Sequence, residues 1–347
     1  MLKFWSKKQL AKRSEIIQGL RTMSQLEVLL GVEAHQLQLM AGQPEYRVFT
    51  IPKKDGSERW IEDPAPPLKA VQRTLNVFLQ AVYYYAKTPA AYGFMVNQKH
   101  DPAPRNIITN AERHLGHDCL LNVDMKDFFH HVKIADVYRV FDQPPFRCED
   151  AVVELMAQLC THQGRLPMGA PTSPVLSNFA TVALDGELWQ FALRHRLTYT
   201  RYADDMSFSG NVPIVEQHRR EIDDIVRSHG FMLNENKLKQ FGPKDVKEVT
   251  GLKLGQKVEV PDEMLDNIEK DLERLQIVME SQNRFAESGS KWVVRFQQQV
   301  QGKIAFVGYV LGDRSERFLK LRNRYENAID PPDVYDSFSW KEFPYFA

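Results

Sequence analysis

The spacing of hydrophobic residues changes along the chain and predicts helices at both ends with strands between them. In residues 1–45, hydrophobic side chains recur every three or four positions, which predicts a packed pair of amphipathic helices. The same spacing returns in residues 65–90. Three later segments combine it with many charged residues and predict an all-helical end, namely 261–279, 292–310 and 316–327.

The middle of the chain mixes short β-prone runs with helical patterns. Residues 47–61 predict a hairpin, because two β-prone runs flank a turn that contains Asp-Gly. Residues 118–124 are an apolar run that ends in a carboxylate, as expected for a buried strand that opens into a site. Two more short strands are predicted in 197–210. The other predictions are helices in 134–141, 148–163, 171–191 and 211–232, and strands in 246–260.

The composition is that of an ordinary globular protein. The chain has 347 residues, of which 43% are hydrophobic and 26% charged. This length is enough for roughly two domains. The 45 basic residues balance the 45 acidic ones, so nucleic-acid binding would need local separation of charge. Three cysteines without CxxC spacing argue against a disulfide framework or a structural zinc site.

The sequence also bears on the cellular compartment. No apolar run approaches the roughly 18 residues that indicate a membrane helix. The first residues carry charges but lack the apolar stretch of a secretory signal. We therefore expect a soluble cytoplasmic protein.

Three aspartates are the clearest candidates for chemistry. Asp204 and Asp205 are adjacent between two β-prone runs, and Asp124 ends the predicted buried strand. Like charges side by side repel, and a carboxylate at a strand end is costly to bury, so a cation is favoured. Carboxylates suit Mg²⁺, and two such ions about 4 Å apart promote in-line phosphoryl transfer. Taken alone, the Asp204-Asp205 pair is explained equally well by an exposed acidic turn.

Two further segments suit contacts with phosphates or bases. The predicted hairpin turn brings Lys53, Lys54 and Arg59 together, which suits gripping a polyphosphate, although a solvent-exposed turn explains them equally well. Residues 164–174 contain two glycines and three prolines. They form a rigid loop that can approach a flat base pair, with Thr172 or Ser173 capping the helix that follows, or alternatively a plain helix entry.

Together these strings resemble the motifs of reverse transcriptases. The matching strings, in chain order, are Asn122-Val-Asp124-Met-Lys-Asp127-Phe-Phe129 (motif A), 166–174 (motif B), Tyr202-Ala-Asp-Asp205 (motif C) and Leu233-Asn-Glu-Asn-Lys237 (motif D). Their order and spacing also agree with that family, so the joint match is far more specific than any single motif.

Further strings resemble markers of bacterial retron reverse transcriptases. They are Asn110-Ala111-Glu112-Arg113-His114, Val249-Thr250-Gly251, Pro52-Lys-Lys-Asp-Gly56 followed by Arg59, Ala91-Tyr-Gly-Phe94, and Gln301-Gly-Lys-Ile304. The resemblance extends from about residue 25 to 325.

This resemblance implies an α+β right-hand polymerase fold. Its palm would hold an antiparallel sheet that bears the acidic site, and its thumb would be helical. The implied parts are N-terminal helices and fingers in 1–105, a palm in 106–260 with finger elements near 134–165, a thumb in 261–330 and a tail in 331–347.

The resemblance assigns the acidic site to metal binding. Asp124 and Asp204 would hold two Mg²⁺ ions with help from the Met125 carbonyl, and Asp205 would complete the cluster. Asp127 is expected to cap the segment that follows it rather than to bind metal.

Two other residues of these motifs receive roles with an open alternative. Phe129 would be a steric gate that excludes a ribose 2′-OH and so selects dNTPs, unless it only packs in the core beside Phe128. Lys237 would donate a proton to the pyrophosphate leaving group, unless it is an exposed lysine at a helix end.

The nucleotide would be held from the fingers and from motif B. Lys53 or Lys54, together with Arg59, would bind the triphosphate. Met168 and Gly169 would lie at the incoming nucleotide, and Met168 stands where the family usually has Gln, which bears on nucleotide preference.

Three residues in the retron-like strings are candidates for RNA contact. Asn110, His114 and Thr250 would either bind RNA or brace the structure around the site, and the sequence favours neither.

The function implied is DNA synthesis on an RNA template with two Mg²⁺ ions and dNTPs. As a retron enzyme, the protein would make RNA-linked single-stranded DNA (msDNA) from a cognate structured noncoding RNA in antiphage defence, alongside an effector protein encoded nearby. The alternatives are a non-retron defence-associated reverse transcriptase and a catalytically silent RNA-binding scaffold.

Overall fold

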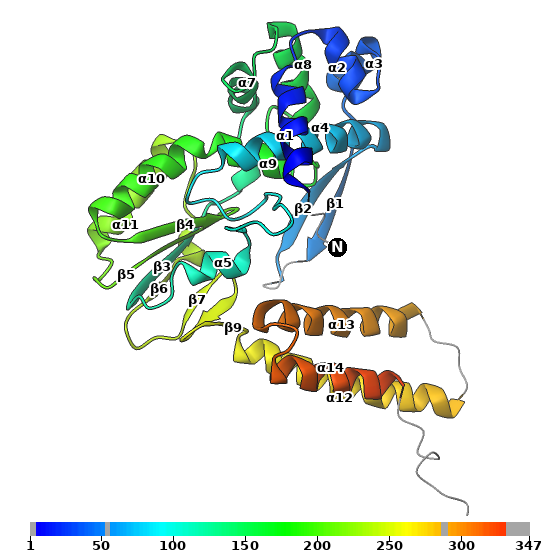
Figure 1. Ribbon diagram of the computed structural model, residues 1–347, viewed down its shortest axis with the longest axis vertical. Helices are drawn as coiled ribbons and strands as arrows, with labels where there is room; N and C mark the ends of the chain where they lie inside the picture. The colour runs from blue at the N-terminus through cyan, green and yellow to red at the C-terminus, as the bar shows by residue number, and fades with distance from the viewer. Residues whose placement is uncertain (1–4, 53–55, 286–290, 331–347) are drawn as a thin grey trace, which may run out of the picture. The chain divides into compact units, whose positions relative to one another are not determined.

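The computed structural model describes residues 5–52, 56–285 and 291–330, with side chains of 282–285 excepted. Contacts between residues divide the chain into two units, Met1–Thr250 and Gly251–Ala347. Each unit has its own hydrophobic core. Figure 1 shows the elements of both units along the chain.

Helices and a hairpin form the first part of the first unit. They are α1 (Lys7–Gln18), α2 (Met23–Leu30), α3 (Ala34–Gly42), β1 (Tyr46–Pro52), β2 (Glu58–Pro64) and α4 (Pro66–Ala86). The hairpin is confirmed, with β1 and β2 antiparallel over their whole length. The prediction of two helices before it was wrong, since the described residues there form three. Gly31 ends α2 with a φ of 68°, a left-handed conformation that glycine adopts without strain.

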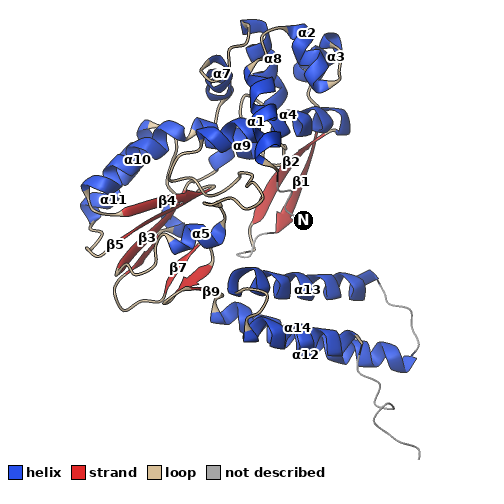
Figure 2. Ribbon diagram, viewed as in Figure 1, coloured by secondary structure: helices blue, strands red, loops and turns tan. Residues whose placement is uncertain are grey.

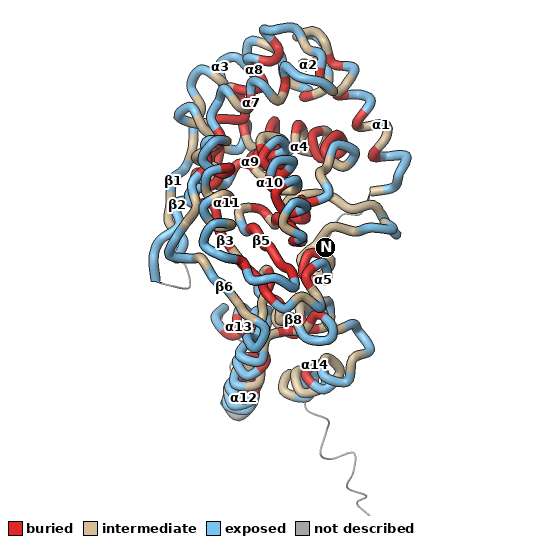
Figure 3. The backbone as a smooth tube through the Cα atoms, turned by 90° about the vertical axis from the view of Figure 1, so that its left-hand side faces the viewer, coloured by how far each residue is buried: buried red, intermediate tan, exposed pale blue. Residues whose placement is uncertain are grey.

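A four-stranded antiparallel sheet is the centre of the first unit. Its order is β4 (Thr198–Tyr202), β5 (Asp205–Gly210), β3 (Cys119–Asp124), β6 (Lys239–Phe241). Leu121, Val123, Met206 and Phe208 point to one face, as the two-residue period of a strand requires, and join the core. Figure 3 shows the buried backbone along these central strands.

Helices cover that apolar face of the sheet. Residues of α10 (Val182–Arg194) and α11 (Glu216–Ser228) belong to the same core as the strands, and α10 contacts both β4 and α11. Figure 2 shows the two helices running beside β4 and β5. The opposite face carries the polar side chains of Asn122, Ser207 and Ser209. One face of the sheet is therefore apolar and packs in the core, and the other is polar.

The other elements of the first unit are α5 (Ile107–Glu112), α6 (Phe128–His131), α7 (Ile134–Asp142), α8 (Asp150–Cys160), α9 (Ser173–Ala180), the 3₁₀ turn η1 (Glu235–Lys237) and β7 (Lys247–Val249). The prediction of one helix over 171–191 was wrong. The helix is interrupted at Thr181, where ψ is 7°, and α9 and α10 lie on either side. The capping role predicted for Thr172 or Ser173 was also wrong, because no side-chain cap is formed and Ser173 Oγ donates to the Pro167 carbonyl.

The second unit consists of a short hairpin and three long helices within the described residues. These are β8 (Leu252–Leu254), β9 (Val258–Glu259), α12 (Asp262–Phe285), α13 (Lys291–Leu311) and α14 (Glu316–Ile329). Ile268, Leu275, Val300 and Val307 form the centre of its core. The three predicted C-terminal helices are therefore confirmed. The division at 250/251 falls before the expected palm–thumb boundary, and the domain limits stay a prediction. No helix among the described residues is long and apolar enough to cross a bilayer.

The turn between β4 and β5 lies against an extended segment that follows α4. The Arg201 amide donates to the Ala90 carbonyl and the Tyr92 amide to the Arg201 carbonyl, both at 2.8 Å. A Cβ atom on Gly93 would come within 2.7 Å of the Ala203 amide nitrogen. Only glycine therefore allows the segment to approach the turn this closely.

This close approach gives a test with a matched pair of glycines. Gly93→Ala is expected to lower the free energy of unfolding by about 1–3 kcal/mol, because the added methyl meets backbone atoms that cannot move aside alone. Gly186 lies in α10 with open space around it, so Gly186→Ala is expected to add about 0.5–1 kcal/mol. Urea denaturation of both variants checks this, and equal effects of the two substitutions would contradict the packing argument.

Candidate active site

The sheet brings the three aspartates together. Asp124 is the last residue of β3 and Asp205 the first of β5, and the two are directly opposed in the antiparallel register. Asp204 lies in the turn just before, and its carbonyl accepts a hydrogen bond from the Met125 amide at 3.0 Å. Residues 80 positions apart in the sequence thus form one carboxylate cluster.

The electrostatics of the cluster are those of crowded like charges. Burial and the neighbouring charge of Asp124 raise the pKa of Asp204, although Lys237 and Arg59 act against this. Burial, Asp204 and Asp124 raise the pKa of Asp205 to about 7. Asp124 itself is only 6% exposed. The cluster therefore has more negative charge than its surroundings neutralise, which favours a bound cation.

Lys237 supplies a positive charge directly on the cluster. Its Nζ lies 2.7 Å from Asp124 Oδ1. The backbone delivers it there, because residues 232–234 run antiparallel to residues 124–126, with the Asn234 amide donating to the Asp124 carbonyl at 2.8 Å. Burial opposes the charge of Lys237, but the hydrogen bond to Asp124 and the nearby carboxylates raise its pKa. Lys237 is exposed and ends the 3₁₀ turn η1, as the alternative expected, yet it is also paired with Asp124. Its role as proton donor stays a prediction.

The donor set fits hard divalent cations, with one qualification from the geometry. Carboxylate oxygens from Asp124, Asp204 and Asp205 and the adjacent Met125 carbonyl are the ligand type that Mg²⁺ takes in proteins. Within the described residues, no three His, Cys, Asp or Glu side chains are arranged to hold a single ion.

The residues expected to hold the triphosphate are described only in part. Arg59 is exposed on β2, and its charge is felt at Asp204. Lys53 and Lys54 lie outside the described residues. Their assignment to the triphosphate stays a prediction.

Phe129 lies in α6, five residues after Asp124, and is partly buried. Its ring centroid is 5.6 Å from that of Phe128 and 5.7 Å from that of Phe94. Phe129 thus packs against two aromatic rings, as the core-packing alternative expects, but the residue remains partly exposed. Its role as a steric gate stays a prediction, which incorporation of ribonucleotides by a Phe129→Ala variant would test.

The loop with Met168 and Gly169 is attached to the β1–β2 hairpin. The Glu62 amide of β2 donates to the Met168 carbonyl at 2.8 Å. Gly169 has a φ of 137°, and a Cβ on it would lie 2.7 Å from the Glu62 carbonyl oxygen. Glycine is therefore required at 169 for both conformation and space. The nucleotide contact expected of Met168 and Gly169 stays a prediction.

Sequence reasoning missed the ion pair that strengthens this attachment. Arg165 donates two hydrogen bonds to the carboxylate of the buried Glu62, at 2.7 and 3.1 Å. Burial opposes ionisation of Glu62, but Arg165 and, less strongly, His130 outweigh it and lower the pKa of Glu62. The available signal was an acidic residue, Glu62, within a predicted strand, but its partner lies 103 residues further on.

Asn110 and His114 lie in the interior rather than on an RNA-accessible surface. Each is 1% exposed. His114 Nδ1 lies 2.7 Å from Ser209 Oγ of β5, and Nε2 lies 2.7 Å from Thr200 Oγ1 of β4. Burial lowers the pKa of His114 to about 3, so the ring is neutral. Of the two alternatives, this geometry favours bracing. Thr250 is partly buried, and its Oγ1 lies 3.5 Å from the Ile107 carbonyl oxygen.

Asp127 occupies the N-cap position of α6 but forms no side-chain cap, and its φ is 45°. The position predicted for it is confirmed, whereas the capping hydrogen bond is not formed.

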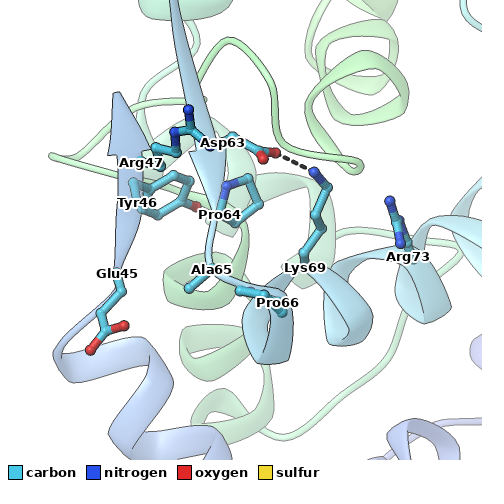
Figure 4. Close-up of a pocket in the computed structure, with 9 residues that line it drawn as sticks. All are labelled: Glu45, Tyr46, Arg47, Asp63, Pro64, Ala65, Pro66, Lys69 and Arg73. Carbon is cyan, nitrogen blue, oxygen red and sulfur yellow. Dashed lines mark hydrogen bonds and ion pairs between the residues drawn. The ribbon is translucent and has the colours of Figure 1, made fainter. Parts of the chain in front are cut away.

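A separate pocket lies at the base of the β1–β2 hairpin. It has a volume of about 580 Å³, and its basic side chains are Arg47, Lys69 and Arg73. Lys69 forms an ion pair with Asp63, as Figure 4 shows. None of the three aspartates of the carboxylate cluster lines this pocket, so it is distinct from that cluster.

Comparison with known proteins identifies the family of this chain. Residues 51–296 match the family described as "Reverse transcriptase (RNA-dependent DNA polymerase)", and the chain belongs to that family. The predicted α+β right-hand fold class is thereby confirmed.

Curated relatives narrow the branch to the retron type. The Retron Ec86 reverse transcriptase of Escherichia coli is 31% identical over 230 residues, which cover 65% of this chain and 68% of that protein. The Retron Mx162 enzyme of Myxococcus xanthus is 32% identical over 272 residues, covering 67% and 54%. The Retron Mx65 enzyme of the same organism is 29% identical over 296 residues, covering 80% and 64%. The predicted resemblance to bacterial retron reverse transcriptases is confirmed.

Among solved structures, a telomerase from Candida albicans in complex with a fragment of telomeric RNA aligns with a TM-score of 0.44 and 10% identity, over 84% of this chain and 64% of that one. This likeness is too distant to support an argument.

Replacing Asp205 with Asn is expected to stabilise the metal-free protein at pH 8. Folding raises the pKa of Asp205 from its ordinary 3.8 to about 7. The ionised carboxylate therefore costs folding free energy above pH 7. This cost shrinks as the pH falls toward the ordinary pKa of 3.8 and vanishes below it, where both states are protonated. Although burial contributes to this shift, the Asp205 residue keeps exposed surface, so solvent screening limits the gain to about 1 kcal/mol.

Urea denaturation in the presence of a chelator, at pH 8 and at pH 4, measures this gain. The matched control is Asp118→Asn, which removes an exposed carboxylate outside the cluster. A gain at pH 4 as large as that at pH 8 would contradict the electrostatic explanation.

Proposed function

We propose that the protein synthesises DNA on an RNA template by joining dNTPs to a primer. The observation that carries this is the meeting of Asp124, Asp204 and Asp205 at one end of the palm sheet of a reverse transcriptase fold. In the reaction, the primer 3′-oxygen attacks the α-phosphate of a dNTP, and pyrophosphate leaves with the electron pair of the broken bond. Positioning and charge neutralisation account for most of the acceleration in such transfers.

Each member of the cluster has a part in this proposal. Asp124 and Asp204 would hold Mg²⁺ with the Met125 carbonyl. Two such ions, when bound, neutralise the attacking and leaving oxygens. Lys237, which already lies on Asp124, would place positive charge and a proton beside the leaving pyrophosphate. Arg59 would bind triphosphate oxygens from the fingers side, since its charge already acts on Asp204.

Primer extension on an RNA template tests this activity. With Mg²⁺ and dNTPs, the wild-type protein is expected to extend the primer, and Asp204→Asn is expected to lower the rate at least about 100-fold, because a charge at the reacting centre is lost. A chelator is expected to abolish extension, and added Mg²⁺ to restore it.

The control for the loss of a negative charge is again Asp118→Asn, which should extend as wild type does. Equal rates for wild type and Asp204→Asn, whether both active or both inactive, would overturn the assignment.

We further propose that the protein works as a retron enzyme in the bacterial cytoplasm. It would use a cognate structured noncoding RNA as template, prime from an internal 2′-OH of that RNA and leave single-stranded DNA joined to it. Antiphage defence with an effector protein encoded nearby would be the biological setting. The support is the similarity to three retron enzymes and the presence of the retron-like strings, among them Asn110–His114 and Val249–Gly251.

Nucleic acid that copurifies with the protein tests the retron proposal. We expect DNA that remains attached to a short RNA after ribonuclease treatment and is released by a debranching enzyme. This product should be missing from the Asp204→Asn preparation. DNA without any branched RNA would instead favour a non-retron defence enzyme, and phage protection that survives Asp204→Asn would favour the silent RNA-binding scaffold.

A further inference from the structure

A fully buried ion pair lies directly beneath the turn that carries Asp204. Arg201 is in β4 and Asp185 is in α10, and both side chains are 0% exposed. Arg201 Nε donates to Asp185 Oδ1 at 2.7 Å, and its Nη2 donates to Oδ2 at 2.8 Å. Although burial opposes the charge of Arg201, Asp185 raises the pKa of the guanidinium. The pair is therefore charged and held in one geometry.

The remaining nitrogen of Arg201 holds the turn itself. Its Nη1 donates to the Ala203 carbonyl at 3.0 Å and to Asn178 Oδ1 at 3.1 Å. Ala203 has a φ of 60°, a conformation that residues other than glycine rarely adopt. Asp204 follows directly. A specific donor thus stabilises a backbone conformation that alanine does not favour, one residue before a carboxylate of the cluster.

The Asp185 carboxylate is also held by hydrogen bonds from residues other than Arg201. The carboxylate also accepts hydrogen bonds from Tyr199 Oη at 3.0 Å and from Thr88 Oγ1 at 2.9 Å. Asn178 in turn donates to the Gly93 carbonyl at 2.9 Å, and Gly93 lies against the Ala203 amide. The turn is therefore enclosed by the guanidinium on one side and the 90–93 segment on another.

Stability alone does not explain such an arrangement. Replacing a buried ion pair by well-packed apolar residues is often neutral or stabilising, because desolvation offsets most of the attraction between the charges. What an arginine adds is geometry, since its planar group can satisfy a carboxylate, an amide oxygen and a backbone carbonyl simultaneously. Lysine has one nitrogen and cannot reach all three.

We propose that Arg201, oriented by Asp185, is a positioning residue that fixes the Ala203-Asp204-Asp205 turn for nucleotidyl transfer. The inference rests on the proposed function, because the turn matters only if Asp204 acts in catalysis. Loss of the Ala203 contact lets the turn shift, and a displacement of about 1 Å near reacting groups costs about 100-fold in rate. Ground-state binding of primer–template and dNTP involves other parts of the protein and is kept.

The test compares Arg201→Lys with Tyr199→Phe. Arg201→Lys keeps a cation for Asp185 but loses the contact with Ala203, so kcat is expected to fall about 100-fold, while the KM for dNTP and the Kd for primer–template change less than about threefold. Tyr199→Phe removes an equally buried hydrogen bond to Asp185 without touching the turn. It is expected to lower the melting temperature and to leave kcat within about threefold of wild type.

A structural readout accompanies the kinetics. Hydrogen–deuterium exchange of a peptide covering 199–208 is expected to accelerate in Arg201→Lys and to stay near the wild-type rate in Tyr199→Phe. If Arg201→Lys does not fold, Asn178→Ala takes its place. That variant keeps the ion pair but removes the second acceptor of Nη1, and a kcat loss of about tenfold is expected.

Wild-type kcat in Arg201→Lys, or in Asn178→Ala where that variant is used, would overturn the inference. So would a kcat that falls in step with melting temperature in both Arg201→Lys and Tyr199→Phe. Failure of the proposed function gives a different result, since wild type and Asp204→Asn would then be equally inactive and neither variant could be slower than wild type.

Discussion

The mutual repulsion of three carboxylates is the constraint on which the rest of the structure depends. Asp124 and Asp205 face each other across two paired strands, and Asp204 is adjacent to Asp205 in sequence. Repulsion alone would separate such charges. The raised pKa values of Asp204 and Asp205 indicate that the surroundings neutralise these charges only in part. The backbone must therefore hold them together, and the remaining negative charge favours a cation at this end of the sheet.

The backbone is held from both faces of the sheet. On one face, the buried guanidinium of Arg201 grips the Ala203 carbonyl. On the other, the neutral ring of His114 spans β4 and β5 through Thr200 and Ser209, each at 2.7 Å. Hydrogen bonds of this kind stabilise by about 1 kcal/mol each, more where a charge takes part. Here these hydrogen bonds mainly fix the positions of β4 and β5, whose ends carry the charged side chains.

Local patterns predicted most of the elements, and long-range contacts were out of their reach. The Asp-Gly turn predicted the hairpin, and the apolar run ending in Asp124 predicted β3, because both signals lie within a few residues. By contrast, β6 is only three residues long and is defined by its pairing with β3, which lies far away in the sequence. The helices α9 and α10 follow each other so closely that their apolar pattern continues across Thr181, so the sequence predicted a single helix. The aspartates were identifiable because carboxylates are costly at strand ends, whereas the contact of Lys237 with Asp124 spans 113 residues.

The retron-like strings illustrate how a marker can be diagnostic without touching RNA. Asn110 and His114 were candidates for RNA contact, yet both side chains are buried, and RNA could reach His114 only if its hydrogen bonds to β4 and β5 broke. Thr250 also lies near this region, since its hydroxyl approaches the Ile107 carbonyl at the start of α5. Both strings thus meet around α5, behind the sheet that carries the carboxylates. Because the chain has equal numbers of acidic and basic residues, RNA binding would need exposed, locally basic surfaces, and the buried Asn110 and His114 are not part of such a surface.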